Sequence, residues 1–425
     1  MAYSICVSMN AFSWVFLAAL AAATLTRWWL ARRQIAHVRA HRDAVPAMFA
    51  ETIPLEAHRK AADYTVAHTR LAILSTVAGT LVLVALTRGR GVAFLTGLTG
   101  IVDVPPLVQD LLLIVAVVLI TGILSLPFSL YRTFVIEQRF GFNRTTFATW
   151  LADLGKGLLV GALLGLPIAA VVIALMRWAG GMWWLWAWTA WMGFQLVVLA
   201  LYPTLIAPLF NKFTPMPEGP ARTRIEALLA RCGFASKGLF TMDGSKRSAH
   251  GNAYFTGFGR AKRIVMFDTL LDRLSPDETE AVLAHELGHF KLKHVAKRIA
   301  WSALMSLAMF ALLAWVMKQD WFYQGLYVPP SQDRPGVSLV LFFLVLPVFT
   351  FLLAPLASWY SRRHEYEADA FAAQNASAAA MVSALVRLYE DNASTLTPDP
   401  LHSAFHDSHP PAALRVAHLE GLVRA

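Results

Sequence analysis

Charged residues and cysteines are both scarce in this chain of 425 residues. Charged residues make up 15% of it, whereas a soluble globular domain carries about 25%, so a wholly soluble protein is excluded. Cys6 and Cys232 are too few and too far apart for a disulfide framework or a C-x-x-C zinc motif. Each is expected to be a small buried side chain.

Basic residues are also missing ahead of the first apolar run. No Lys or Arg precedes residues 11–26, whereas Arg27, Arg32 and Arg33 follow them. A cleaved secretory signal has the opposite order, with its basic residues first. We therefore expect a retained first membrane span whose N-terminus lies outside.

Hydrophobic residues are present in excess. They make up 57% of the chain, and the mean hydropathy is +0.51. They gather in seven stretches, each close to the roughly 20 residues that a membrane-spanning helix needs. The stretches are 11–30, 69–87, 107–131, 157–176, 182–205, 299–317 and 338–360. The sequence therefore predicts seven transmembrane helices, with Asp110 at an interface or facing the protein interior.

The net charge of +10 is distributed unevenly. Of the 37 Lys and Arg residues, 32 fall in segments that lie inside if the N-terminus is outside. Those segments are 27–70, 131–156, 208–298 and 361–425. Such a bias is the positive-inside pattern of membrane proteins and does not indicate nucleic-acid binding. It places 208–298 and 361–425 on the cytoplasmic side, where a hairpin of two spans allows them to form one domain.

The strongest local signal is an H-E-x-x-H motif made by His285, Glu286 and His289. Residues four apart share one face of a helix, so both imidazoles can reach one Zn²⁺. Glu286 is then placed beside the metal, where it can act as general base towards water. A solvated helix with accidental histidines is disfavoured, because Ser275 followed by proline indicates a helix start and the neighbours are apolar.

A catalytic zinc needs a third protein ligand, and the segment after the last span offers one. Glu365 and Asp369 are four residues apart, so Glu365 could bind zinc while Asp369 accepts a hydrogen bond from a ligand histidine. On spacing alone, an ordinary charged helix at the membrane surface explains this segment equally well. We expect Glu367 to point away from this face and His294 to be solvated.

Two further segments carry weaker signals. His409 precedes a proline, and a histidine held in a rigid turn can stabilise an oxyanion, with Arg415 orienting it or a carboxylate; the pattern alone favours a structural or solvated histidine. Asn252, Ala253 and Tyr254 lie in a predicted strand ahead of the motif. That strand could bind extended substrate backbone at a sheet edge, or it could be an interior strand.

In their order along the chain, these motifs resemble the CAAX prenyl protease type I family of integral-membrane zinc metalloproteases. The matching segments are 133–143, 252–255, 263–271, Glu365 with Asp369, and His409 with Pro410. The resemblance implies seven transmembrane helices that enclose an intramembrane chamber. It implies Glu365 as third ligand, Asp369 as partner of a ligand, and His409, supported by Arg415, as stabiliser of the transition state.

The predicted fold class is an all-α membrane protein with a zincin-like cytoplasmic α+β metalloprotease domain. An N-terminal membrane domain of five spans covers 1–207, and the first part of the protease domain covers 208–298. The helical hairpin covers 299–360 and the C-terminal part of the protease domain covers 361–425. Strands are expected at 238–242, 252–257 and 263–268, because these short runs are bounded by Gly and Ser.

The function that the resemblance implies is a zinc metalloendopeptidase with one Zn²⁺ per chain. Its substrate would be a peptide or a C-terminal protein segment, CAAX-like or prenylated, on membrane-associated proteins. Asn252, Ala253 and Tyr254 would then bind that substrate. One alternative is a general quality-control protease for membrane proteins. The other is a non-catalytic membrane chaperone or transporter that contains zinc.

We also expect membrane lipids as partners, no nucleic acid, and a monomer. Arginine outnumbers lysine by 27 to 10, which favours a bacterial homologue in the inner membrane; a eukaryotic homologue would lie in the endoplasmic reticulum membrane. The active site should face the cytoplasm or a chamber open to it.

Overall fold

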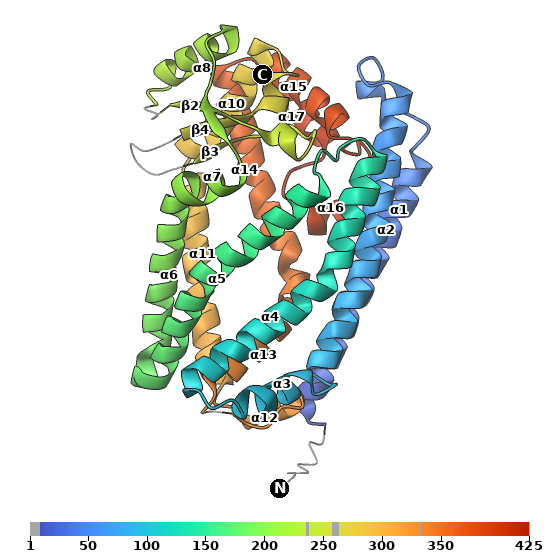
Figure 1. The fold of residues 1–425 in the computed structure, drawn as a ribbon. Helices are drawn as coiled ribbons and strands as arrows, with labels where there is room; N and C mark the ends of the chain where they lie inside the picture. Colours follow the sequence, from blue (N-terminus) through green and yellow to red (C-terminus); the bar gives the residue numbers. More distant parts are fainter. Residues whose placement is uncertain (1–8, 235–237, 257–262, 332, 425) are drawn as a thin grey trace.

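The computed structural model describes residues 9–234, 238–256, 263–331 and 333–424. Cys6 and Gly257 lie outside these ranges. The described chain is mainly helical, with one small sheet near the C-terminal end of the molecule (Figure 1). The described chain begins and ends at opposite ends of the elongated structure (Figure 1), as an odd number of spans requires.

Seven helical segments in the described chain are long and apolar enough to cross a membrane, which confirms the predicted number. They are α1 (Ala11–Ala40), α2 (Leu55–Leu86), α4 with its π-helical extension (Pro106–Glu137), α5 (Phe147–Trp178), α6 with its extensions (Gly180–Phe210), α11 (His294–Val316), and α13 continued by α14 (Pro335–Asn375). Within these segments the structure has α4 (Pro106–Tyr131), α6 (Trp183–Leu201), α7 (Ala207–Phe210), α13 (Pro335–Thr350) and α14 (Ala354–Asn375). Several segments continue beyond the apolar stretches, so these helices extend past the predicted spans.

The spans pack together mainly at the end that is distant from the sheet. Their largest core gathers the first half of α4, the start of α6 and the last turns of α2, α5 and α11, and it also includes α1 from Phe16 to Leu30 and α13 along its whole length. The short helices α3 (Gly91–Gly100) and α12 (Asp320–Gly325) close this end (Figure 1). By the predicted topology this is the outer end of the protein.

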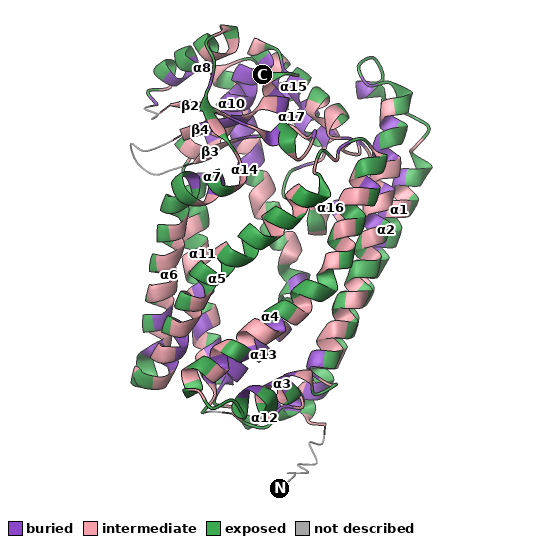
Figure 2. Cartoon of the chain, viewed as in Figure 1, coloured by how far each residue is buried: buried purple, intermediate pink, exposed green. Residues whose placement is uncertain are grey.

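Towards the sheet the same helices bury little of their surface. Residues 118–131 of α4 and 147–171 of α5 contain no buried position, and only 11% of an 18-residue apolar window is buried in each of α2, α4, α5 and α6 with its extensions. A helix packed along one whole face would bury an apolar stripe at least 100° wide, or roughly a quarter of its residues. Exposed positions accordingly run along both sides of α4 and α5 (Figure 2). Near the sheet α4 and α5 bury no residue, whereas α1 and α2 still pack against each other there. The intramembrane chamber stays a prediction that this arrangement favours.

A buried ion cluster holds the outer end together. Asp110 on α4 is fully buried and accepts from Arg177 at 2.6 Å and from Arg334 at 2.7 Å. Gly336 allows this contact, because a Cβ there would lie 2.6 Å from the Cβ of Asp110. The three charges tie α4 to α5 and to the start of α13. Asp110 therefore faces the protein interior, one of the two positions expected for it.

The small sheet has four described strands in the order β1-β2-β4-β3. They are β1 (Phe213–Pro215), β2 (Leu239–Met242), β3 (Ala253–Thr256) and β4 (Arg263–Phe267). β2 and β4 are parallel, whereas β1 and β3 pair antiparallel on the two sides. β3 is therefore an edge strand among the described residues, one of the two positions left open by its sequence.

The helices of the domain around the sheet come from both polar regions. They are α8 (Pro220–Arg231), α9 (Asp268–Leu271), α10 (Pro276–Lys291), the C-terminal part of α14, α15 (Ala378–Asp391), α16 (Pro400–His406) and α17 (Ala412–Arg424). One hydrophobic core contains Ile225 of α8 and Leu283 of α10 together with Met381 of α15 and Leu419 of α17. The hairpin of α11 and α13 thus returns the chain to the same core. The four domain bounds given above stay a prediction.

Asp110→Ala should strongly destabilise the outer end of the bundle. The substitution leaves the guanidinium groups of Arg177 and Arg334, each with 18% of its side chain exposed, without their shared carboxylate. Removing one partner from a buried ion cluster costs about 3–5 kcal/mol of unfolding free energy. Thermal unfolding in detergent should show a clear drop in midpoint against Asp103→Ala, a control at an exposed position. Equal midpoints for the two variants would contradict the assigned role of this cluster.

Candidate metal centre

Helix α10 carries the H-E-x-x-H motif, and its start is fixed by local sequence. Ser275 caps the helix by accepting from the backbone N–H of Glu278, whose side chain accepts in return from the backbone N–H of Ser275. This reciprocal capping box satisfies two backbone donors that the first turn would leave unpaired. The cap fixes where the helix begins and therefore which face carries His285 and His289.

The close approach of α10 and α14 depends on Gly288. A Cβ at this position would lie 3.0 Å from the Cβ of Phe371 and 3.1 Å from the Cα of Ala368. The two helices therefore pack with almost no side chain between their backbones. This contact places Glu365, one turn before Ala368 on α14, beside the two histidines of α10.

Three ligand atoms converge at this point, from His285, His289 and Glu365. The Nε2 atoms of the two histidines are 3.2 Å apart. The carboxylate oxygens of Glu365 lie 3.3 Å from His289 Nε2 and 3.5 Å from His285 Nε2. Ligand atoms held tetrahedrally at about 2.0–2.1 Å from one zinc ion would be about 3.3 Å from each other. The donor set and its spacing therefore fit zinc.

Glu365 also carries a buried oxygen that lacks a hydrogen-bond partner in the structure. Oε2 is inaccessible to solvent and makes no hydrogen bond. A buried carboxylate oxygen without a partner is costly, and a bound cation satisfies it. This oxygen lies 3.5 Å from Nε2 of His285 and 3.5 Å from Nε2 of His409, so a metal bound between the ligands could satisfy it.

The partners of His285 are those predicted for an oriented ligand. Its Nδ1 lies 2.8 Å from Asp369, which is fully buried. Asp369 in turn accepts two hydrogen bonds from Arg415, at 2.9 and 2.5 Å. A carboxylate on Nδ1 fixes the tautomer that leaves Nε2 free to bind a metal.

Electrostatics differ between the two neighbouring residues of the motif. Burial by itself would lower the pKa of His285, but its interactions with the carboxylates of Asp369 and Glu365 outweigh burial and raise that pKa to about 9. Burial raises the pKa of Glu286 above its usual range, opposed by the nearby histidines. A carboxylate of raised pKa is a stronger base than an exposed one, as proton transfer near neutral pH requires.

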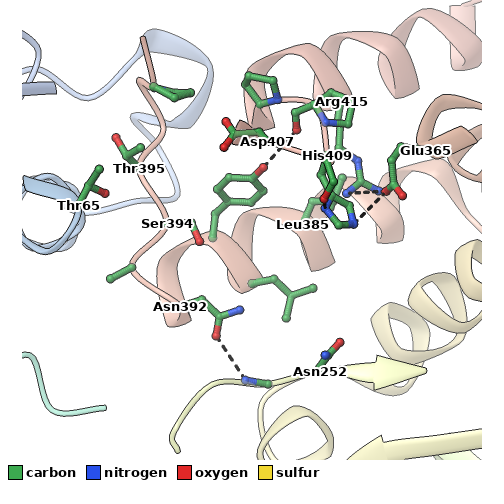
Figure 3. A pocket seen from close by; sticks show the side chains of 18 of the residues that line it. Thr65, Asn252, Glu365, Leu385, Asn392, Ser394, Thr395, Asp407, His409 and Arg415 are labelled. Atoms are coloured by element: carbon green, nitrogen blue, oxygen red, sulfur yellow. Dashed lines mark hydrogen bonds and ion pairs between the residues drawn. The ribbon is translucent and has the colours of Figure 1, made fainter. Parts of the chain in front are cut away.

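A cavity of about 670 Å³ opens beside these residues. Glu286, His409 and Arg415 line it, and so do Asn252 and Ala253. Figure 3 shows His409 and Arg415 both directed at Glu365, with His409 Nε2 at 3.5 Å from its carboxylate. The side chain of His409 is 63% exposed, so it faces the cavity rather than the core.

Tyr254 lies differently from Asn252 and Ala253. It does not line the cavity; its hydroxyl contacts the sulfur of Met242 at 3.9 Å, and its ring packs edge-on against Phe267. Successive side chains of a strand point to opposite faces, so Tyr254 can reach a substrate only through its backbone.

The prediction that His294 is solvated was wrong. His294 is fully buried and its Nδ1 lies 3.0 Å from Nδ1 of His289. Glu367 lies 3.0 Å from Nε2 of His294 and keeps 34% of its side chain exposed. The reason is a turn after α10: Lys293 adopts a left-handed conformation with φ of 59°, which directs the next residue back towards the motif.

The motif search also missed cavity residues that come from the membrane spans. Gln34 of α1 and Tyr64 and His68 of α2 line the same cavity. Polar residues on long, mostly apolar helices are expected to face protein or water rather than lipid. In the sequence, however, these three residues lie in the polar segment 27–70, outside the apolar stretches 11–30 and 69–87, so the apolar pattern did not mark them.

Comparison with known proteins places these features in a family context. The model "CAAX prenyl protease N-terminal, five membrane helices" matches residues 34–212, and "Peptidase family M48" matches residues 215–423. The rice CAAX prenyl protease 1 homolog is 40% identical over 317 residues, which cover 74% of each chain. CAAX prenyl protease 1 of Saccharomyces cerevisiae is 36% identical over 71% of this chain and 70% of its own.

A solved structure is similar over nearly the whole chain. The crystal structure of S. mikatae Ste24p matches with a TM-score of 0.90 and 29% identity, and the match covers 97% of this chain and 100% of that one. The relatives named here are eukaryotic, and they give no support to the bacterial origin that the arginine content suggested.

Zinc affinity should fall as the pH is lowered. In the metal-free chain His285 holds a proton below its pKa of about 9, and zinc must displace that proton to bind. Apparent affinity should therefore drop by about tenfold per pH unit between about pH 8.5 and 6.5, measured by competition with a chelator of known affinity. Asp369→Asn, which removes the buried charge, should move this fall to lower pH. An affinity that stays flat across the range would contradict the assignment.

Proposed function

This chain belongs to the CAAX prenyl protease 1 family of M48 peptidases, and on that premise we propose that it cleaves lipidated or CAAX-like proteins near their C-terminus at the membrane surface. It is a multi-pass membrane metalloprotease. Its substrates are peptides or proteins. The observation that carries the proposal is the convergence of three ligand atoms beside Glu286 at a cavity that reaches a membrane span.

We assign His285, His289 and Glu365 as the ligands of one zinc ion. When bound, zinc supplies Lewis acidity towards a water molecule and the scissile carbonyl. Glu286 accepts the proton of that water and passes it to the leaving amine, a role supported by its burial and its place beside His285. Only three protein ligands converge within the described residues, and a structural zinc site normally has four.

His409 and Arg415 are proposed to act on the other side of the ligand set. His409 faces the cavity and can donate a hydrogen bond to the oxygen that gains negative charge during attack. Arg415 is buried and paired with Asp369, and it lies 3.9 Å from Glu365. Its positive charge stabilises the ionised carboxylates of Asp369 and Glu365 and adds positive electrostatic potential beside the ligand set.

The substrate backbone is proposed to bind along β3. Asn252 and Ala253 line the cavity, and β3 pairs with β4 on one side only within the described chain. Backbone N–H and C=O groups at such an edge can pair with an extended peptide, independent of its sequence. This independence also favours a second candidate function, the general cleavage of membrane-protein segments.

The walls of the cavity come from both a membrane span and the domain around the sheet, which supports a substrate that is held in the membrane. Thr65, His68 and Thr69 belong to span α2, whereas Met381 and Leu385 belong to α15 of the cytoplasmic domain. A chain that is anchored in the bilayer can thus reach the ligand set without leaving the membrane surface. The positive-inside bias supports a cytoplasmic active site, and we retain a monomer as the expected state.

Glu286→Gln should retain zinc and lose turnover by about 10²–10⁴-fold, because the ligand set is intact and the base is absent. The test is mass spectrometry of products from matched C-terminal peptides, one prenylated and one not, with metal content measured on the same protein. Wild-type protein should release a short C-terminal fragment from the prenylated peptide. It should release that fragment more slowly, or not at all, from the unprenylated peptide.

The outcomes separate the candidates. Equal cleavage of both peptides at scattered bonds would favour general proteolysis over C-terminal processing. Wild-type turnover by the Glu286→Gln protein would contradict the role of Glu286 as base.

A further inference from the structure

A second group of potential metal-ligand side chains lies next to the proposed zinc site. It consists of His294 at the start of α11 and His364 and Glu367 on α14. His294 is fully buried and His364 is 6% exposed. Neither histidine takes part in the reaction proposed above, so their burial beside a metal ligand calls for another explanation.

We propose that His294 is a positioning residue that links the ligand His289 to Glu367 and fixes the tautomer of that ligand. This inference rests on the assignment of His289 as a zinc ligand. The two contacts are His289 Nδ1 to His294 Nδ1, at 3.0 Å, and His294 Nε2 to Glu367 Oε2, also at 3.0 Å. They form a continuous chain from the ligand to a carboxylate.

The positions of the protons in this chain follow from the metal ligand. A neutral imidazole carries one N–H. If Nε2 of His289 binds the metal, its proton is on Nδ1, and Nδ1 must donate to His294. His294 then accepts at Nδ1 and carries its own proton on Nε2, where Glu367 accepts it. With zinc on Nε2 of His289, this is the one pair of neutral tautomers in which every ring nitrogen of the two histidines has a partner.

Glu367 is held in place by the charges around it. Arg363 lies 3.2 Å from one of its oxygens, and Lys297 lies 3.8 Å from the other. Both cations stand at the surface, whereas His294 is buried beneath them. The carboxylate therefore connects a buried ligand partner to the exposed edge of the domain, as outer partners of metal ligands commonly do.

The ring of His364 supports His294 by stacking and not by coordination. The two rings are 4.1 Å apart and inclined by 13°, nearly parallel. Lone pairs of imidazole nitrogens lie in the ring plane, so those of stacked rings run side by side and do not converge on one ion. Both nitrogens of His294 are also engaged already. The geometry therefore favours a positioning role over a second metal site.

The backbone adds a further observation. Lys293, which directs His294 towards the motif, holds a left-handed conformation that is unfavourable for a residue with a Cβ. The turn between α10 and α11 is thus retained in a strained form that brings His294 to His289. A solvated histidine at this position would need no such turn.

The test compares three substitutions by zinc affinity, measured by chelator competition, and by the visible spectrum of the cobalt-substituted protein. His294→Phe removes the acceptor, and it should weaken zinc binding by about 10–100-fold and change the cobalt spectrum. His294→Asn keeps an acceptor close to the position of Nδ1 and should recover most of the affinity. His364→Phe keeps the stacked ring without its nitrogens and should match the wild type.

Glu367→Ala provides a test that does not depend on a buried substitution. The partly exposed side chain can be removed without a cavity in the core, and zinc affinity should fall as in His294→Phe but by a smaller factor.

If His294→Phe and His364→Phe bind zinc equally well, the positioning role is wrong. Two zinc ions per wild-type chain, reduced to one by His364→Phe, would overturn it in favour of a second metal site. If the His289→Ala protein binds zinc as tightly as the wild type, the proposed zinc ligands themselves are wrong.

Discussion

Helices α10 and α14 touch backbone to backbone at Gly288 and Ala368, and the site depends on that contact. Two ligands lie on one helix and the third on another, separated in sequence by the α11–α13 hairpin. A Cβ at residue 288 would lie only 3.0–3.1 Å from atoms of Phe371 and Ala368, so α14 would have to shift slightly to accommodate it. The domain core from both polar regions surrounds this contact, so burial of apolar surface holds the ligand atoms at a spacing that fits zinc.

The two ligand histidines are held by different means. His285 contacts a buried carboxylate directly, and that carboxylate is neutralised by Arg415. His289 contacts a neutral histidine, and the next carboxylate lies nearer the surface. A buried ion pair is rigid but costs desolvation, whereas a chain of neutral rings costs less. Packing in the membrane region is also uneven, because α4 and α5 are buried only towards the outer end, whereas α1 and α2 stay packed beside the cavity.

Much of this could be predicted because it depends on local periodicity. Span length identified the seven helices, and spacing of four residues placed His285 with His289 and Glu365 with Asp369 on common faces. His294 could not be placed in this way, because a left-handed residue at the end of α10 breaks the helical count. The edge position of β3 depends on strand pairing across the domain, which one strand's sequence does not encode.

The most direct test of the ligand set is X-ray absorption at the zinc edge of the zinc-loaded protein. Two imidazole nitrogens and two oxygens at about 2.0–2.1 Å are predicted, one oxygen from Glu365 and one from solvent. Glu365→Ala should replace or remove one of these oxygens while both imidazoles remain. A third imidazole, a sulfur ligand, or a spectrum unchanged by Glu365→Ala would contradict a site assembled from His285, His289 and Glu365.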